Sequence, residues 1–239
     1  MVSDITSTPK GIPMTSTALS SDGFQLGAVH ATDGELSFTI TTADGHPVTR
    51  FGEAHGKQLH LIVVRSDGAY FRHRHPVLDP ATGVWTIPWT WEAAGSYRVF
   101  TDFTPDGGPG VTLSRTVEVP GEYRPWDPLP HARSETDGYT VTLEGALGNG
   151  TILTARVTRN GQPVPALERY LGSYGHLVAL RQGDLAYLHI HALEGEPADG
   201  IRFHAEAPTA GRYLLYLDFQ VDGVAHTAGF VLDAESEKR

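Results

Sequence analysis

Three histidines recur at identical spacing in the two halves of the sequence: His60, His73 and His75, then His176, His189 and His191. The two sets are offset by 116 residues, and together they account for six of the twelve histidines in the chain. Neutral imidazoles are common ligands of Zn(II) and Cu(II), and three of them leave room for a carboxylate or a water to complete the coordination. The spacing therefore predicts a histidine cluster for Cu(II) or Zn(II) in each half.

The spacing within each set is typical of a β-hairpin. His60 begins one predicted strand, and His73 and His75 end the next, so that the last two share a face through the period of two. A two-residue turn centred on residues 66–67 or 67–68 sets His60 opposite one or the other of them. In both registers three imidazoles lie on one face, whereas a three-residue loop would turn His60 away from its partners.

Two further residue types are candidates to complete such a cluster. Asp102 and Asp218 occupy matching positions on the strand after next, where each could supply a carboxylate ligand or orient a histidine from behind. His55 lies five residues before His60 and is a candidate fourth ligand in the first half only, because Leu171 stands at the matching position. The chain has no cysteine and only two methionines, which excludes a blue-copper centre and a methionine-rich Cu(I) site.

The same histidines also fit a purely structural role. A histidine near a strand end often packs against its neighbours and donates to a backbone carbonyl, and a duplicated domain copies such residues with everything else. The chain would then be a non-catalytic adhesion or scaffold protein. In that case Trp85, Trp89 and Trp91 would suit a recognition patch private to the first half.

A third hypothesis is that the chain is a cupin-like metalloenzyme. Both H-x-H phrases are followed by an acid, Asp79 or Glu194, which is similar to the first cupin motif, but the acid spacing differs and the second motif is absent. The chain also lacks a G-x-S-x-G elbow, a phosphate-cradling glycine loop and repeated paired carboxylates. These features leave enzymatic activity undecided, favour a protein without catalysis, and assign no catalytic residue.

The repeat that carries the histidines extends over most of the chain. HLIVVRSDGAYFRHRHP from residue 60 aligns with HLVALRQGDLAYLHIHA from residue 176, and AGSYRVFTDF aligns with AGRYLLYLDF at the same offset. Short runs rich in β-branched and aromatic residues alternate with Gly, Asp, Asn and Pro turns about every ten residues. This pattern predicts an all-β chain of two tandem immunoglobulin-like β-sandwich domains related by internal duplication.

Four prolines, at positions 120, 125, 128 and 130, mark the boundary between the repeats. The expected organisation is a flexible lead at 1–21, a first sandwich at 22–119, a proline-rich linker at 120–136, a second sandwich at 137–233 and a polar tail at 234–239.

The composition narrows the classes of partner. A formal charge of −10 with scattered basic residues argues against nucleic acid, which needs a concentrated basic surface. No run approaches the ~20 apolar residues of a transmembrane helix, and residues 1–21 lack the apolar core of a signal peptide. The composition does not indicate an oligomeric state.

The histidine phrases resemble those of bacterial exported proteins with tandem YtkA-like, immunoglobulin-type domains, over nearly all of residues 45–233. The resemblance implies export to the periplasm, the cell surface or the extracellular space, and a link to heavy-metal or copper handling. Copper is then the expected ion, zinc the alternative, and another exported or membrane protein a candidate partner. The link to metal carries over to seven histidines: His55, His60, His73, His75, His176, His189 and His191.

The sequence departs from that group at one strand end. Ala192 follows the second H-x-H phrase where Pro76 follows the first. We therefore expect a differently shaped strand end in the second half.

Overall fold

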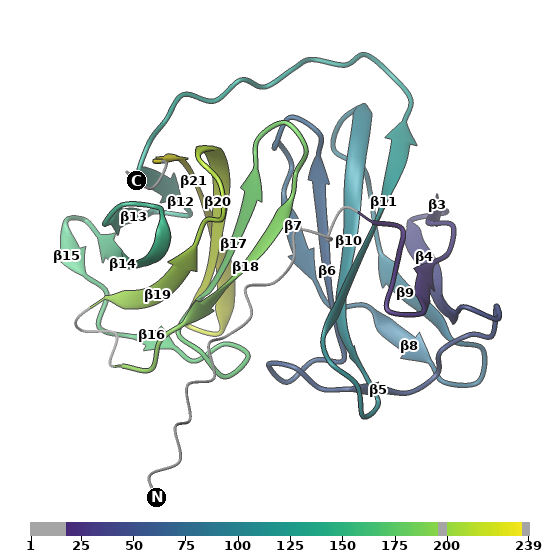
Figure 1. Ribbon diagram of the computed structural model, residues 1–239. Coiled ribbons are helices and arrows are strands. Elements are labelled where there is room, and N and C mark those ends of the chain that lie inside the picture. The colour runs from purple at the N-terminus through teal and green to yellow at the C-terminus, as the bar shows by residue number, and fades with distance from the viewer. Residues whose placement is uncertain (1–17, 196–199, 236–239) are drawn as a thin grey trace, which may run out of the picture.

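The computed structural model describes residues 18–195 and 200–235, and all regular secondary structure within these ranges is β-strand. Figure 1 shows two bodies of strands side by side, joined by one long connection that arches over one end. Each body is an antiparallel immunoglobulin-like β-sandwich with its own core, so the predicted tandem all-β fold is confirmed. The described residues form no helix long and apolar enough to cross a membrane. Most of the expected lead and tail, at 1–17 and 236–239, lies outside the described residues.

The first domain is built from two sheets. Its strands are β1 (Ser20–Ser21), β2 (Phe24–Leu26), β3 (His30–Thr32), β4 (Glu35–Thr42), β5 (Phe51–Gly52), β6 (Leu59–Arg65), β7 (Arg72–Arg74), β8 (Val77–Asp79), β9 (Val84–Pro88), β10 (Gly95–Pro105) and β11 (Val111–Val119). One sheet has the order β1-β2-β4-β9-β8, with β3 paired to β4, and the other has the order β11-β10-β6-β7, with β5 paired to β10. Their inner faces meet in a core that contains Phe38, Trp85 and Tyr97.

The second domain has the same layers, linked here into one continuous ladder. Its strands are β12 (Arg133–Thr136), β13 (Tyr139–Glu144), β14 (Asn149–Arg159), β15 (Gln162–Pro163), β16 (Leu167–Glu168), β17 (His176–Arg181), β18 (Tyr187–Ala192), β19 (Ile201–Glu206), β20 (Gly211–Val221) and β21 (Val224–Ala234). The order is β12-β13-β14-β19-β18-β17-β20-β16, with β15 paired to β14 and β21 to β20. Phe203, Phe219 and Phe230 are buried in its core.

The hairpins that carry the histidines have the same register in both domains. β6 pairs with β7, and β17 with β18, at positions that match through the offset of 116 residues. In the first domain Ile62 pairs with His73, the register of a turn centred on residues 67–68. This is one of the two predicted registers, and it sets His60 opposite His75.

Strand β6 is buried on both faces, and this decides where the histidines point. Leu61 and Val63 belong to the core of the first domain, whereas Ile62 and Val64 belong to a separate apolar cluster between the domains. Because side chains alternate along a strand, His60 shares the face of Ile62 and Val64. The histidines therefore lie on the outer face of their sheet, which the second domain covers, and not inside the sandwich.

The two domains pack through these outer faces in a nearly two-fold arrangement (Figure 1). Phe71 stacks on Tyr216 of the other domain with ring centroids 3.9 Å apart, and Phe100 contacts Tyr187 at 5.5 Å. Phe71 and Tyr187 occupy matching positions of the repeat, as do Phe100 and Tyr216. Each domain thus offers the same two positions to the other, and burial of this apolar surface holds the domains together.

The connection between the domains is attached to the hairpin turn of the first domain. Arg65 and Asp67 form a buried ion pair. Asp67 accepts a hydrogen bond from the backbone N–H of Trp126, and Arg65 donates to the carbonyl of Arg124. The Arg65 guanidinium also lies over the ring of Tyr123. Polar contacts, in addition to proline stiffness, therefore hold this part of the chain in place.

The strand ends after the histidines differ between the domains. β7 ends at Arg74, and Pro76, which has no backbone N–H, separates it from β8. In the second domain the ladder continues, because Ala192 pairs with Phe203 of β19. His191 therefore lies in a regular strand, whereas the first domain turns away from its sheet at the equivalent point.

Candidate metal centre

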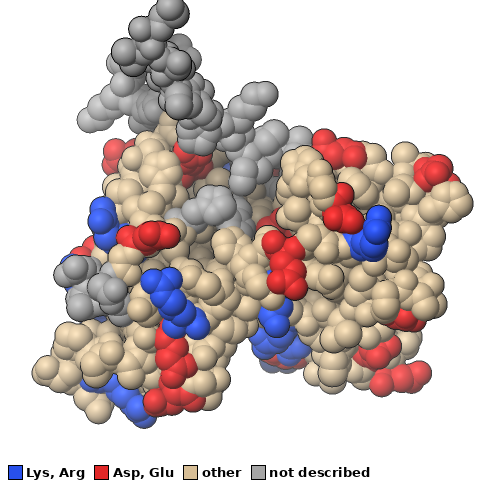
Figure 2. Space-filling view, turned by 90° about the horizontal axis from the view of Figure 1, so that it is seen from below, with Lys and Arg blue, Asp and Glu red and all other residues tan. Residues whose placement is uncertain are grey.

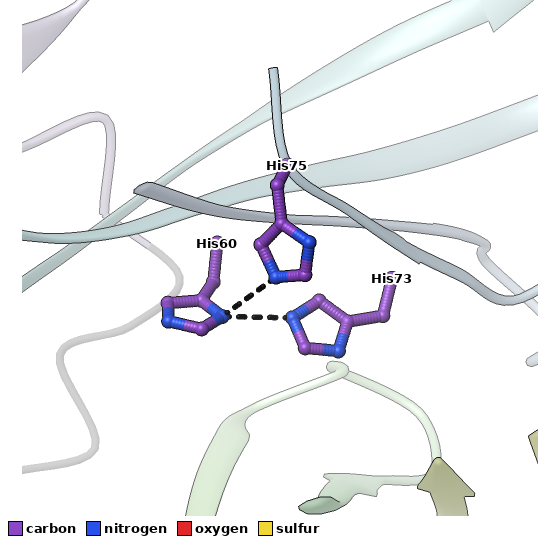
Figure 3. A group of neighbouring side chains, drawn as sticks. All are labelled: His60, His73 and His75. Carbon is purple, nitrogen blue, oxygen red and sulfur yellow. Dashed lines mark hydrogen bonds between the residues drawn. The ribbon is translucent and has the colours of Figure 1, made fainter. Parts of the chain in front are cut away.

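Three histidines of the first domain bring one ring nitrogen each to a common point. His60 lies on β6, His73 on β7 and His75 directly after the end of β7. Nδ1 of His60 is 3.0 Å from Nε2 of His73 and 3.2 Å from Nε2 of His75 (Figure 3). All three nitrogens lie within 4.8 Å of one another. His60 and His73 are buried and His75 is half-buried, because the second domain covers this face.

The outer nitrogen of His60 is fixed by the backbone. Nε2 lies 3.0 Å from the carbonyl oxygen of Ala54. A carbonyl oxygen only accepts hydrogen bonds, so Nε2 carries the hydrogen and, in the neutral ring, Nδ1 presents a lone pair to the cluster. Ala54 and Lys57 close a tight turn with reciprocal backbone hydrogen bonds, which makes this anchor firm.

The outer nitrogen of His73 is fixed by the other domain. Nδ1 lies 2.7 Å from Oδ2 of Asp218, and both side chains are buried. Oδ1 of the same carboxylate accepts a hydrogen bond from the Thr227 hydroxyl. Because a carboxylate is an acceptor, Nδ1 of His73 carries the hydrogen and Nε2 of the neutral ring carries a lone pair.

Two lone pairs therefore face each other across 3.0 Å, between Nδ1 of His60 and Nε2 of His73. Facing acceptors repel unless a proton or a cation lies between them. In a tetrahedral site with metal–nitrogen bonds of about 2.0–2.1 Å, ligand nitrogens are about 3.3 Å apart. The separations from His60 to the other two rings are close to this value, so the three nitrogens have the spacing of a metal site.

The surroundings keep the imidazoles of His60 and His75 neutral, which is the form that binds metal. Burial, aided by the neighbouring His73, lowers the pKa of His60 from 6.5 to about 4. Burial and the same neighbour lower the pKa of His75 to about 2. At neutral pH the lone pairs of these two rings are therefore available to an ion.

Asp102 and Asp218 occupy equivalent places but have different contacts. Asp102 pairs with His60 across β10 and β6, and its charge partly opposes the lowering of the His60 pKa. Its Oδ2 lies 3.5 Å from the hydroxyl of Tyr187. Asp218 pairs with His176 in the same way, yet its carboxylate bonds to His73 of the other domain. Neither carboxylate is among the three atoms that converge.

His176 and His55 lie beside the triad without being part of it. Nε2 of His176 is 2.7 Å from the carbonyl of Tyr170, the equivalent of the His60 anchor, and burial lowers the His176 pKa to about 4. The ring of His55 is 6.0 Å from that of His60 and 5.4 Å from that of His176. Histidines from both domains thus gather at one place in the interface.

The side chains of His189 and His191 lie outside the described residues. Their backbones belong to β18, where His189 pairs with Val178 as His73 pairs with Ile62. The backbone of the second hairpin thus repeats the register that positions His73.

The sequence reasoning missed the turns that anchor His60 and His176. Ala54 and Tyr170 supply matching carbonyls, and each is followed by a non-glycine residue with φ +53°, His55 or Leu171. Such turns favour glycine at the next position, where φ is again positive. Gly56 and the glycine 116 residues later were the residues from which these turns could have been predicted.

The tryptophans proposed as a recognition patch pack into the first domain. Trp85 and Trp89 are buried in the core, and Trp91 is partly buried against it. The Arg72 guanidinium covers the ring of Trp89 at 4.8 Å. These three rings therefore contribute to the interior rather than to an open aromatic surface.

A cavity of about 490 Å³ approaches the triad from the side of the second domain. His55 and Gly56 line it on one side, and Arg169, Tyr174 and His176 on the other. The cavity therefore reaches residues that are one ring away from the triad.

On the face in Figure 2, basic side chains lie among acidic and neutral ones, so this face has no continuous basic surface.

Comparison with known proteins identifies one family. Residues 22–121 and 134–236 each match the model of the family described as Domain of unknown function (DUF8832). No curated protein matches the chain. The two matched segments correspond to the two sandwich domains.

Several solved structures are similar at low identity. A Corynebacterium diphtheriae protein described as membrane anchored is 10% identical with a TM-score of 0.27, and the match covers 91% of this chain and 60% of that one. Fibronectin(III)-like modules of Clostridium thermocellum CbhA are 11% identical with a TM-score of 0.23, over 90% and 99% of the two chains. The Ig1-2 module of the Drosophila receptor tyrosine phosphatase DLAR is 9% identical with a TM-score of 0.22, over 88% and 92%.

Proposed function

We propose that this chain, which belongs to the Domain of unknown function (DUF8832) family, is an exported metal-binding protein that buffers or delivers copper, with zinc as the alternative ion. The ion is held by His60, His73 and His75. The observation that carries the proposal is the convergence of these three nitrogens within 4.8 Å. Two of the rings are held by outer hydrogen bonds, as is usual for metal-ligating histidines.

A second site in the second domain belongs to the same proposal. It would consist of His176, His189 and His191. Support comes from the matched backbone register of the two hairpins and from the equivalent anchor of His176 on a backbone carbonyl.

Export and a partner follow from the resemblance of the histidine phrases to exported YtkA-like domains. In a buffering or delivery role the site must release its ion to another protein, which would be an exported or membrane protein. In this proposal an ion would reach the triad through the cavity lined by His55 and His176, because the ring of His55 lies 6.0 Å from that of His60.

Metal titration of the full chain tests the proposal. Protein purified without an affinity metal is analysed for elemental content and titrated with Cu(II) and with Zn(II). We expect one tightly bound ion for the triad, and loss of that ion in the combined variant His60→Ala, His73→Ala, His75→Ala. The matched control is the exposed His30→Ala. Absence of tight binding in the wild type, or full binding in the triple variant, overturns the proposal.

A scaffold role is the second candidate, and one contact favours it. A proton on Nε2 of His73 would satisfy the facing lone pair of His60 and give His73 a charge opposite to that of Asp218, with which it forms a buried pair. The histidines would then be a structural network that fixes the packing of two sandwiches. In that case the titration finds no tight ion, and the triple variant loses stability that added metal does not restore.

A further inference from the structure

We infer that the metal site is shared between the two domains, because Asp218 of the second domain holds His73 of the first in the orientation and tautomer that the ion requires. This role rests on the proposed function. It adds a positioning residue from outside the histidine hairpin, and it makes domain docking a condition of tight metal binding.

The contact is specific and enclosed. Asp218 Oδ2 is 2.7 Å from His73 Nδ1, and the two side chains are only 9% and 5% exposed. Thr227 donates to the other carboxylate oxygen, so both oxygens are engaged and the carboxylate is held in one orientation. An enclosed charge held from both sides supports a fixed functional geometry.

Asp218 reaches His73 only when the domains are docked. Its strand, β20, also carries Tyr216, which stacks on Phe71 and donates a hydrogen bond to the carbonyl of Gly68. These contacts fix β20 against the β6–β7 hairpin. The first domain alone contains all three ligands but not the acid behind one of them.

The chemical consequence is a linkage between the ion and the interface. A carboxylate that accepts the outer N–H of a ligating histidine raises the basicity of the ring and fixes its tautomer. Separation of the domains would remove that acid and open the buried triad to water. Docking of the domains would therefore tighten binding of the ion. By thermodynamic linkage, the bound ion would favour docking by the same factor.

The decisive experiment compares two matched variants of the full chain, Asp218→Asn and Asp102→Asn. Both are made in a background with His189→Ala and His191→Ala, so that only the first site is measured. Cu(II) affinity is determined by competition with a chelator, and the bound ion is examined by electron paramagnetic resonance. We expect about 10–100-fold weaker binding and an altered spectrum for Asp218→Asn. Asp102→Asn removes a charge near His60 but leaves the outer hydrogen bonds of His60 and His73 in place, so for this variant we expect affinity within about threefold and an unchanged spectrum.

Hydrogen exchange tests the linkage itself in the same background. One equivalent of Cu(II) should raise protection in β6 and also in β20 of the second domain, which then holds no complete site. Asp218→Asn should confine the added protection to the first domain. If Cu(II) raises protection only in the first domain of the parent protein, the linkage is overturned.

The possible failures are distinguishable. A parent protein that binds no ion overturns both the proposed function and the shared site. Normal affinity and spectrum in Asp218→Asn overturn only the role of Asp218. Should that variant fail to fold, Thr227→Val removes the second hydrogen bond to the carboxylate and should weaken binding several-fold, and unchanged binding there overturns the role of Asp218.

Discussion

Nδ1 of His73 and Oδ2 of Asp218 are 2.7 Å apart, although the two residues belong to different domains and lie 145 positions apart in the chain. Each domain therefore carries an acid beside its own first histidine, and the second domain directs that acid to the other domain. The two copies of the repeat thus pack as a pair, and His60, His73 and His176 lie at the interface between them.

His55 should contribute little to the affinity of the triad. Its ring is 6.0 Å from that of His60, and none of its atoms is among the three converging nitrogens. His55→Leu introduces the residue found at the matching position Leu171, which has the same φ of +53°, so the backbone tolerates the change. We expect Cu(II) affinity within about threefold of the wild type, against a loss of more than about tenfold for His75→Ala. A titration in which both variants lose equal affinity would make His55 a ligand.

The metal-free protein should lose stability as the pH falls below 6.5, the ordinary pKa of a histidine side chain. Burial lowers the pKa of His60 and of His176 from 6.5 to about 4, so between these values the unfolded chain binds more protons than the folded one. Their contribution is present above pH 6.5 and is lost as the pH falls through the folded values near 4. Urea unfolding with a chelator present should show a fall of a few kcal/mol between about pH 7 and about pH 4.5.

The control for that pH profile is His176→Asn, which removes one of the histidines whose pKa burial lowers. Its stability should depend less steeply on pH over the same window. Equal urea midpoints at neutral and acidic pH in the wild type would contradict the burial of neutral imidazoles in the folded state.

The stack of Phe71 on Tyr216 should account for a large part of the docking energy. Tyr216→Ala removes a buried aromatic ring from the interface and should lower the free energy of unfolding by about 3–5 kcal/mol. Tyr216→Phe keeps the stack but leaves the Gly68 carbonyl without its donor, and should cost about 1 kcal/mol. Calorimetry of both variants gives the two values, and a loss below about 1 kcal/mol in Tyr216→Ala would mean that the domains do not rely on this contact.

The ion pair that holds the connecting segment should matter far more than its counterpart in the second domain. Asp67→Ala leaves the buried Arg65, whose side chain is 3% exposed, without its carboxylate partner, and should lower the free energy of unfolding by about 3–5 kcal/mol. Asp184→Ala breaks the pair that Arg181, the residue matching Arg65, forms one position later in its turn; water reaches this pair, and the change should cost less than about 1 kcal/mol. Chemical denaturation of both variants tests the difference, and equal losses would contradict it.

The hairpin of the first cluster could be predicted from the sequence because its geometry is local. A turn of known length and a period of two are enough to bring His60 towards His73 and His75. The tandem all-β fold was predictable for a similar reason, since short β-rich runs and their turns repeat at a fixed offset.

The meeting of the two domains was not predictable, because no local pattern encodes which sheet faces meet. The sequence contained one indication, the largely apolar run LHLIVVR of β6, and the structure buries this strand along its whole length. A continuous apolar run is typical of a strand covered on both faces, and one cover had to come from outside the domain. The direction of Asp218 towards His73 depends on that docking and has no counterpart in residue spacing.

X-ray absorption spectroscopy of the full chain loaded with one equivalent of Cu(II), in the His189→Ala and His191→Ala background, tests metal binding by the triad most directly. We predict three imidazole nitrogens at about 2.0 Å from the ion, and loss of this signature when His60, His73 and His75 are replaced by alanine. A first shell without imidazoles, or a spectrum that survives the triple replacement, would contradict the account.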